Sequence, residues 1–283
     1  MAHGQNEGKY DGILDIRPVT GHCGVEILGL DLSKPLPEEA YAAIRRATAD
    51  YGVAFFRGQS LTPTDHDRFA RHFGPVKKVR FVKTVEGYPH MSEVRKEEQQ
   101  TTNIGGAWHT DGSFYAEPPT GSILVARELP PVGGDTLFLN MAAVYESLSE
   151  GLKATLSRLR AVHSNSGYRF AKSGGGLINT DQDEEKAVHP VVVTHPVNGR
   201  KSLYVNAAYT KHFEGWSEAE SQPLLQYLYS YARERAEFFC RFHWDEGSVA
   251  FWDNITAWHY AANDYQGERR LMHRITFEGE PLA

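Results

Sequence analysis

Residues 108–138 decide the fold, and they read WHTDGSFYAEPPTGSILVARELPPVGGDTLF. Two runs in this part of the chain are predicted to be strands. They are GSILVARELP (121–130) and, after the turn PPVGG, DTLFLNM (135–141). His109 and Asp111 precede them, separated by one residue. Side chains alternate between the two faces of a strand, so these two would point the same way on a strand or at its edge. An imidazole and a carboxylate side by side supply two corners of a facial triad for a metal ion, which one further histidine would complete.

A His-x-Asp pair is weak evidence by itself. The chain has 13 histidines, so such a pair is expected by chance, and a second one occurs at residues 243–245 (HWD). The first pair has a C-terminal counterpart, FWDNITAWHYAANDYQGERRLMHRITFEG (251–279), which offers His259 and then Arg270 and Arg274. A guanidinium binds a carboxylate through two parallel N–H donors. The same arginines could instead form surface ion pairs with nearby glutamates.

The rest of the chain alternates strand-like and helix-like segments. Apolar runs and alternation predict strands within 16–32, 52–58, 189–196, 201–206, 237–244, 248–254 and 269–279. Periodicity and capping signals predict helices at 37–50, 62–74, 142–160 and 218–235. Residues 77–105 are expected to be a lid or an ordinary surface loop, and 161–187 a loop insertion. We expect residues 1–11 to be disordered and residues 12–283 to form one mainly β domain with flanking helices.

Charge and missing motifs count against several functional classes. The formal net charge is −6, and no basic block is present, so a nucleic acid is not the expected partner. The sequence lacks GxGxxG, the P-loop, GxSxG and HExxH. These absences disfavour dinucleotide-dependent dehydrogenases, kinases, serine hydrolases and zinc proteases. An anionic substrate would have to be attracted by local arginine or lysine side chains.

The N-terminal sequence and the two cysteines indicate the cellular compartment to expect. The polar start MAHGQNEGKYDG does not resemble a signal peptide, and no run of 18 apolar residues exists to span a membrane. Cys23 and Cys240 fit no metal-binding or disulfide spacing and suit free thiols in a reducing compartment. We therefore expect a cytoplasmic protein without membrane partners.

Six blocks of the sequence together resemble the TauD/TfdA family, the taurine and 2,4-dichlorophenoxyacetate dioxygenases. They are GVEILGLDLSKPL, VAFFRGQSLT, RFARHFGPV, residues 108–138, HPVVVTHPVNGRKSLYVN and residues 251–279. Their order and spacing agree over roughly residues 13–280. The resemblance implies a double-stranded β-helix, a jelly-roll core of the cupin type, with helices packed outside it.

The resemblance also implies roles for individual residues. Fe(II) would be held by His109, Asp111 and His259. The distal carboxylate of 2-oxoglutarate would be bound by Arg270 and Thr136. The residues implied near the substrate are Arg274, Gly112, Phe114 and Tyr209, with Arg274 meeting its anionic group. Arg80 is a further candidate, which could meet a substrate carboxylate or could simply be solvated.

The reaction implied is hydroxylation of a small organic acid by O₂, with 2-oxoglutarate converted to succinate and CO₂. Sulfonates, alkyl sulfates and aryloxyalkanoates all suit these residues. Taurine fits less well, because Val79 or Arg80 stands where the taurine enzyme has a histidine. Two alternatives stay open: a biosynthetic tailoring oxygenase acting on an amino acid or natural product, and a non-catalytic cupin-like binding protein. A homo-oligomer is a family expectation.

Overall fold

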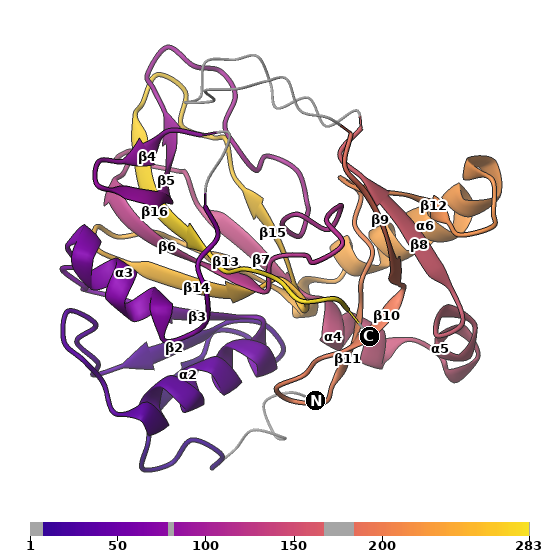
Figure 1. The fold of residues 1–283 in the computed structure, drawn as a ribbon, viewed down its shortest axis with the longest axis horizontal. Helices are drawn as coiled ribbons and strands as arrows, with labels where there is room; N and C mark the ends of the chain where they lie inside the picture. Colours follow the sequence, from indigo (N-terminus) through magenta and orange to yellow (C-terminus); the bar gives the residue numbers. More distant parts are fainter. Residues whose placement is uncertain (1–7, 79–81, 167–183, 283) are drawn as a thin grey trace.

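The computed structural model describes residues 8–78, 82–166 and 184–282. In this part of the chain, an eight-stranded sheet in the order β1-β2-β3-β14-β6-β16-β5-β4 faces a three-stranded sheet in the order β13-β7-β15 (Figure 1). Two smaller sheets, β12-β8-β9 and β10-β11, lie beside them. This mainly β architecture with flanking helices is the jelly-roll core that the sequence predicts.

The strands are β1 (Asp15–Pro18), β2 (Val25–Leu28), β3 (Val53–Phe56), β4 (Thr84–Val85), β5 (Tyr88–Lys96), β6 (Gly121–Glu128), β7 (Thr136–Asn140), β8 (Arg160–Ser164), β9 (Lys186–Pro190), β10 (Val192–Thr194), β11 (Lys201–Leu203), β12 (Thr210–Phe213), β13 (Phe239–Phe242), β14 (Val249–Asp253), β15 (Ala257–Ala261) and β16 (Arg270–Thr276). The helices are α2 (Glu38–Tyr51), α3 (Pro63–Arg71), α4 (Met141–Ser147), α5 (Glu150–Leu156), α6 (Glu218–Arg233) and the 3₁₀ helix η1 (Ala236–Phe238).

The space between the two facing sheets is filled by a buried apolar cluster. Phe55 and Met272 come from the large sheet, and Phe138 and Phe242 from the small one. The rings of Phe55 and Phe242 stack across the interior with centroids 3.9 Å apart. Each such side chain contributes about 1.5–3 kcal/mol by leaving water. The apolar filling fixes how the two sheets face each other, and therefore how residues on their inner faces meet.

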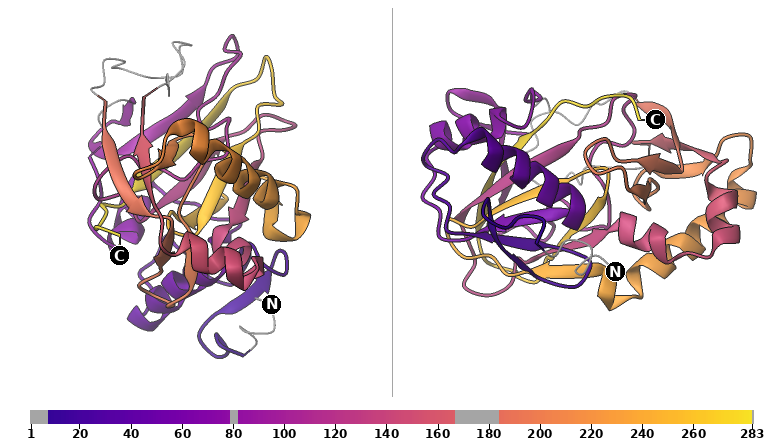
Figure 2. Two further views of the ribbon diagram at one scale, coloured as in Figure 1. Left: turned by 90° about the vertical axis from the view of Figure 1, so that its right-hand side faces the viewer. Right: turned by 90° about the horizontal axis from the view of Figure 1, so that it is seen from below.

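Helices cover the outer faces. In Figure 1, α2 and α3 lie against the large sheet on the side away from the small one, and Ile44 and Phe69 join the sheet's second buried cluster there. Thr62 caps α3 in a capping box with Asp65, and Ser217 caps α6, in agreement with the helix starts predicted at 62 and 218. Figure 2 shows α4, α5 and α6 grouped at the other end of the molecule, beside β8, β9 and β12.

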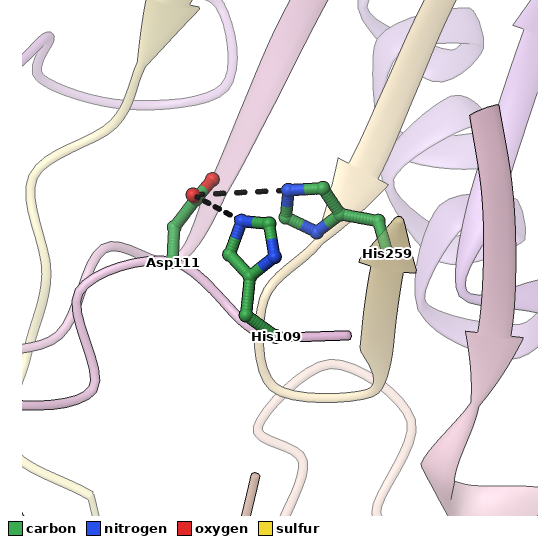
Figure 3. A group of neighbouring side chains, drawn as sticks. All are labelled: His109, Asp111 and His259. Atoms are coloured by element: carbon green, nitrogen blue, oxygen red, sulfur yellow. Dashed lines mark ion pairs between the residues drawn. The ribbon is translucent and has the colours of Figure 1, made fainter. Parts of the chain in front are cut away.

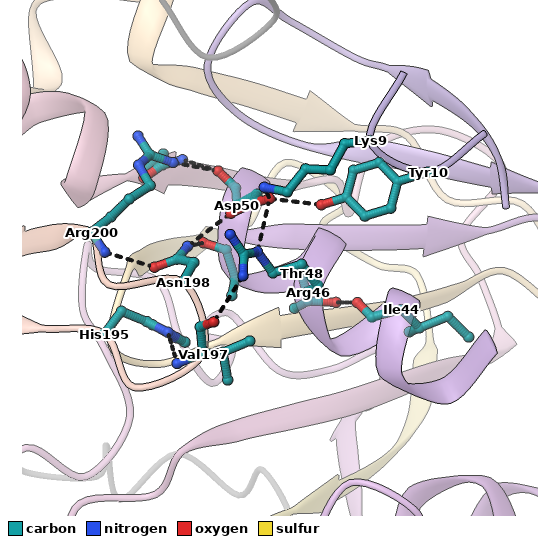
Figure 4. A network of polar contacts seen from close by, with 12 residues as sticks. Lys9, Tyr10, Ile44, Arg46, Thr48, Asp50, His195, Val197, Asn198 and Arg200 are labelled. Carbon is teal, nitrogen blue, oxygen red and sulfur yellow. Dashed lines mark hydrogen bonds and ion pairs between the residues drawn. The ribbon is translucent and has the colours of Figure 1, made fainter. Parts of the chain in front are cut away.

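A buried carboxylate ties three distant segments together. Asp50, at the end of α2, accepts hydrogen bonds from Tyr10 (2.7 Å) and Asn198 (3.0 Å) and pairs with Lys9 (Figure 4). The backbone oxygen of Asp50 accepts a bond from Arg200 (2.7 Å). The N-terminal segment, α2 and the β10–β11 turn are thereby held in one arrangement.

Three of the expected boundaries are wrong. Residues 8–11 are not disordered, since Tyr10 is buried and bonded to Asp50. The expected helix 142–160 is two helices, because Leu148 leaves the helical conformation and Ser149 caps a new one. The ends of the expected insertion, 161–164 and 186–187, are strand, while its centre lies outside the described residues.

The stretch 77–105 is not simply a loop. It contains β5, a nine-residue strand whose residues 91–96 pair with β16. Periodicity missed it because its sequence, YPHMSEVRK, is largely polar and its polar residues are paired. Examples are the contact between His90 and Asp67 and the ion pair of Glu93 with Arg95. The expectation of a loop throughout 77–105 is therefore wrong for residues 88–96.

Two further expectations concern cysteines and membranes. Cys23 and Cys240 are free thiols, as predicted, and their sulfur atoms lie 3.7 Å apart in the interior. Within the described residues, no helix combines the length and the apolar character needed to cross a membrane.

Candidate active site

Two histidines from distant parts of the chain are joined backbone to backbone. The N–H of His259, on β15, donates to the carbonyl of His109 (2.8 Å), and the N–H of His109 donates back (3.2 Å). His109 thus forms an isolated antiparallel bridge at the edge of β15. Their rings lie 4.1 Å apart between centroids. The structure thus places His109 at a strand edge, while Asp111 lies in the turn that follows.

Asp111 completes a group of three converging side chains (Figure 3). Its Oδ1 lies 3.6 Å from Nε2 of His109 and 3.8 Å from Nε2 of His259. One ligand atom from each residue lies within 4.8 Å of the other two. This is the one group of three or more metal-capable side chains in the described part of the chain. Two imidazoles and one carboxylate on one side of a metal ion leave its remaining positions open.

The protonation states suit metal binding. His109 Nδ1 lies 2.7 Å from the carbonyl of Ala107, to which it donates, and this contact orients the ring so that Nε2 faces Asp111. Burial lowers the pKa of His259 to about 3, so its imidazole is neutral. Burial alone would raise the pKa of Asp111, but Arg274 and the two histidines hold it well below its usual range. The site therefore offers Nε2 of His109, the neutral imidazole of His259 and the carboxylate of Asp111.

Packing holds the ligands in place. The ring of His259 lies 4.9 Å from that of Trp252 and 6.2 Å from that of Phe138. The other carboxylate oxygen of Asp111 accepts a long hydrogen bond from Ser122 (3.5 Å). Because these neighbours are fully or nearly fully buried, the ligand side chains have little freedom to turn.

The inner face of β16 brings two arginines into the same interior. Arg270, Met272 and Arg274 alternate along one face, and Met272 belongs to the apolar cluster between the sheets. Arg274 is near the metal group, with Nη1 3.5 Å from Oδ1 of Asp111. Arg270 is only 5% exposed, and its Nε and Nη2 have no hydrogen-bond partner among the described residues. A buried, unpartnered guanidinium is costly unless a ligand satisfies it.

Thr136 lies on the small sheet opposite these arginines. In the β7–β15 register, Thr136 pairs with Ala261 and Phe138 pairs with His259, so Thr136 shares a face with the metal-binding histidine. Its Oγ1 accepts a hydrogen bond from the indole N–H of Trp244 (3.0 Å). The guanidinium of Arg270 lies 5.8 Å from the centroid of the same indole ring. A hydroxyl can accept and donate at once, so the Thr136 proton remains available to a ligand.

The expected substrate-side residues gather beside the metal group. The ring of Tyr209 packs edge-on against Phe114 (4.9 Å between centroids) and against His109 (6.5 Å). Gly112 has φ of +58°, and a Cβ there would meet Pro119 at 2.8 Å, so only glycine fits this turn. Arg80 lies outside the described residues, and its expected role is not addressed by the structure.

The sequence did not reveal a buried polar network behind this turn. Ser113 Oγ accepts a hydrogen bond from Asn206 (3.0 Å) and lies 3.0 Å from Nδ1 of His163. Asn206 also accepts a bond from the backbone N–H of Tyr209 (2.9 Å). Burial and the nearby His189 lower the pKa of His163 to about 3, so the network is uncharged. It links the metal-ligand loop to β8 and to Tyr209.

The second His-x-Asp pair is not a metal site. His243 is exposed and bonds to Asp135 (2.8 Å), while Asp245 pairs with Arg57 at the surface. Only the residue between them, Trp244, turns inward. The assignment of this pair to chance was right.

Comparison with known proteins identifies the family. Residues 15–276 match the model described as "Taurine catabolism dioxygenase TauD, TfdA family". The chain belongs to the TauD/TfdA family. It is therefore a 2-oxoglutarate-dependent dioxygenase by family, with a His-Asp-His group of the kind that such enzymes use to hold a metal.

Relatives of the TauD/TfdA family differ in the substrates their names give. The chain is 36% identical to an alkylsulfatase of Acinetobacter baylyi, covering 94% of this chain and 86% of that protein. It is 35% identical to an α-ketoglutarate-dependent sulfate ester dioxygenase of Pseudomonas putida (94% and 90%). It is 32% identical to the 2,4-dichlorophenoxyacetate dioxygenase of Cupriavidus pinatubonensis (90% and 93%). Family membership alone does not fix the substrate.

Solved TauD/TfdA structures share the fold. A taurine dioxygenase from Burkholderia xenovorans superposes with a TM-score of 0.81 at 33% identity, covering 96% of this chain and 91% of that one. A complex of AAD-2 with Mn(II) and N-oxalylglycine gives 0.77 at 29% identity, covering 95% and 99%. The double-stranded β-helix expected from the sequence is confirmed.

Proposed function

We propose that this protein hydroxylates a small anionic organic molecule, with sulfate esters as its preferred substrate class, and uses Fe(II), O₂ and 2-oxoglutarate. The observation that carries the proposal is a pair of inward-facing arginines. Arg270 and Arg274 share one face of β16, and Arg274 lies next to Asp111 of the metal group. Two fixed cations in one interior suit one dianionic co-substrate and one anionic substrate.

His109, Asp111 and His259 would hold the metal. Their donor set, two imidazoles and a carboxylate with open positions, is that of non-haem iron oxygenases. When bound, iron and 2-oxoglutarate supply the oxidising chemistry that inserts one oxygen atom of O₂ into a C–H bond. The protein's part is to orient the reactants and exclude water.

Arg270 and Thr136 would bind the distal carboxylate of 2-oxoglutarate. Arg270 has two unpartnered nitrogens in the interior, and Thr136 retains a hydroxyl proton to donate. N-oxalylglycine, bound in the AAD-2 structure, has the carboxylates and oxalyl carbonyl of 2-oxoglutarate with NH replacing one CH₂. A relative of similar fold thus accommodates a molecule of this shape together with a divalent metal.

Arg274 would bind the substrate's anionic group beside the metal. It is partly exposed, and its Nε has no partner among the described residues. Gly112, Phe114 and Tyr209 would form the wall that contacts the organic part, since aromatic rings suit an alkyl or aryl body.

A sulfate ester is favoured over a sulfonate or an aryloxyalkanoate on the basis of the relatives. The alkylsulfatase and the sulfate ester dioxygenase are 36% and 35% identical, against 33% for the taurine dioxygenase and 32% for the aryloxyacetate enzyme. Hydroxylation of the carbon that bears the sulfate oxygen gives an unstable intermediate. Its C–O bond to sulfate breaks, which releases sulfate and a proton and leaves an aldehyde.

The test is product formation across a substrate panel. Iron-loaded protein is incubated with 2-oxoglutarate, O₂ and an alkyl sulfate, a sulfonate, an aryloxyalkanoate or an amino acid. We expect alkyl sulfates to give succinate, aldehyde and sulfate in equal amounts. Stimulation by an amino acid alone would favour a tailoring oxygenase. No succinate with any compound, from folded and iron-loaded protein, would favour a binding protein.

A further inference from the structure

Lys96 is a second buried cation in the interior of the sheet. It is only 2% exposed. Its ammonium group donates to the backbone carbonyls of Tyr265 (3.2 Å) and Glu268 (3.4 Å), in the connection between β15 and β16. It also lies 4.5 Å from the centroid of the Tyr265 ring. Within the described residues, no carboxylate lies at ion-pair distance from it.

The sheet register sets Lys96 beside Arg270. The two residues are direct partners in the antiparallel pairing of β5 with β16. Directly opposed residues project from the same face, with Cβ atoms about 4.5–5.5 Å apart. Both side chains therefore start from neighbouring positions on the inner face of the large sheet.

Two buried cations at neighbouring positions are unfavourable without a counter-charge. Asp135 interacts electrostatically with Arg270, but its carboxylate already forms an ion pair with Arg241. The two carbonyls and the ring at Lys96 supply partial charges only. A ligand with full negative charge at this end of the interior would remove the imbalance.

From this arrangement we infer that Lys96 is a positioning residue for the distal carboxylate of the co-substrate, acting with Arg270. The inference rests on the proposed 2-oxoglutarate site. Lys96 adds a second positive charge at the position next to Arg270 in the sheet. It also holds the segment that carries Tyr265, through the two backbone carbonyls.

The chain offers variants that separate charge from packing. Lys96→Met keeps most of the length and loses the charge, and Lys96→Arg keeps the charge. Lys96→Gln keeps a hydrogen-bond donor for the two carbonyls and removes the charge. It replaces Lys96→Met in the test if that variant does not fold. Binding is measured by calorimetry on Mn(II)-loaded protein, which does not depend on turnover. The two ligands are 2-oxoglutarate and 2-oxopentanoate, which has the same metal-chelating end and no distal carboxylate.

We expect Lys96→Met and Lys96→Gln to weaken 2-oxoglutarate binding roughly tenfold or more, since a nearby charge is removed from a poorly solvated site. Lys96→Arg should bind within about threefold of the wild type. Binding of 2-oxopentanoate should be unchanged in all three. If both ligands weakened equally, or neither did, the inference would be overturned. If the wild type bound no 2-oxoglutarate, the proposed site itself would be wrong.

Discussion

The guanidinium of Arg274 lies 3.5 Å from the carboxylate of Asp111, so the cation proposed for the substrate is paired with a metal ligand. The pair joins β16 of the large sheet to the loop that carries Asp111. Removal of either partner leaves the other charge in a largely enclosed site. The metal group and the proposed substrate cation are therefore coupled through this pair, and metal binding and substrate binding have to be measured separately for each variant.

Asp111→Ala should abolish tight binding of a divalent metal, because it removes the only carboxylate of the group. Mn(II) binding by calorimetry measures this directly. The matched control is Asp245→Ala, from the second His-x-Asp pair, which should bind metal as the wild type does. Tight metal binding by Asp111→Ala would show that the ligands are assigned wrongly.

Arg270→Ala should raise the 2-oxoglutarate concentration needed for half-maximal succinate formation by about 10²-fold, since a buried charge-assisted pair is lost. Arg269→Ala is the matched control. Arg269 is partly exposed and pairs with Glu97 and Glu128 at the surface, so its loss should change the requirement little. Equal effects in the two variants would place the carboxylate anchor elsewhere.

Arg274→Met should raise KM for the anionic substrate by about tenfold or more, because the charge that meets the anion is removed. The 2-oxoglutarate requirement should change much less. Part of the succinate should then form without matching product. The ratio of succinate to aldehyde, measured beside KM for both molecules, checks this. A selective rise in the 2-oxoglutarate requirement would contradict the assignment.

Ser113→Ala should loosen the loop that carries Asp111. The substitution removes the hydroxyl that joins His163 and Asn206 and leaves buried groups unpaired, at a cost of about 1–3 kcal/mol. We expect the midpoint of urea unfolding to fall and the yield of product per succinate to drop. Unaltered stability and yield would mean that the network has no positioning role.

His66 should make the protein sensitive to acid. Burial, with the charges of Arg127 and His273, lowers the pKa of His66 to about 3. The unfolded chain then binds this proton near pH 6.5 and the folded chain does not. Stability from this group is complete above about pH 6.5 and declines as the pH falls towards 3.

His66→Leu should therefore reduce the loss of unfolding free energy between pH 7.5 and pH 5 by up to about 2 kcal/mol. Urea unfolding of both proteins at the two pH values measures it. Parallel losses in wild type and variant would exclude His66 as a source of the acid sensitivity.

The sequence predicted those parts of the molecule that rest on local signals. The apolar run at 52–58 became β3, and the capping boxes at Thr62 and Ser217 start α3 and α6. The converging histidines and Asp111 were found because the resemblance joined two motifs 150 residues apart in the chain. Their contact depends on backbone pairing that no local pattern shows.

The parts that were missed depend on long-range register. The polar residues of β5 find their partners partly within the strand and partly on distant segments, and Lys96 bonds to carbonyls of the β15–β16 connection. The link between Ser113 and His163 spans 50 residues and ordinary residue types. Such polar contacts become visible only when the strands are assembled.

The most direct test of the central claim is release of labelled CO₂ from 2-oxoglutarate labelled at C1, by iron-loaded wild type and Asp111→Ala in the presence of O₂ and an alkyl sulfate. We predict release by the wild type, dependent on iron and O₂ and increased by the alkyl sulfate, and none above background from the variant. Equal release by both proteins, or none from iron-loaded wild type, would contradict the claim.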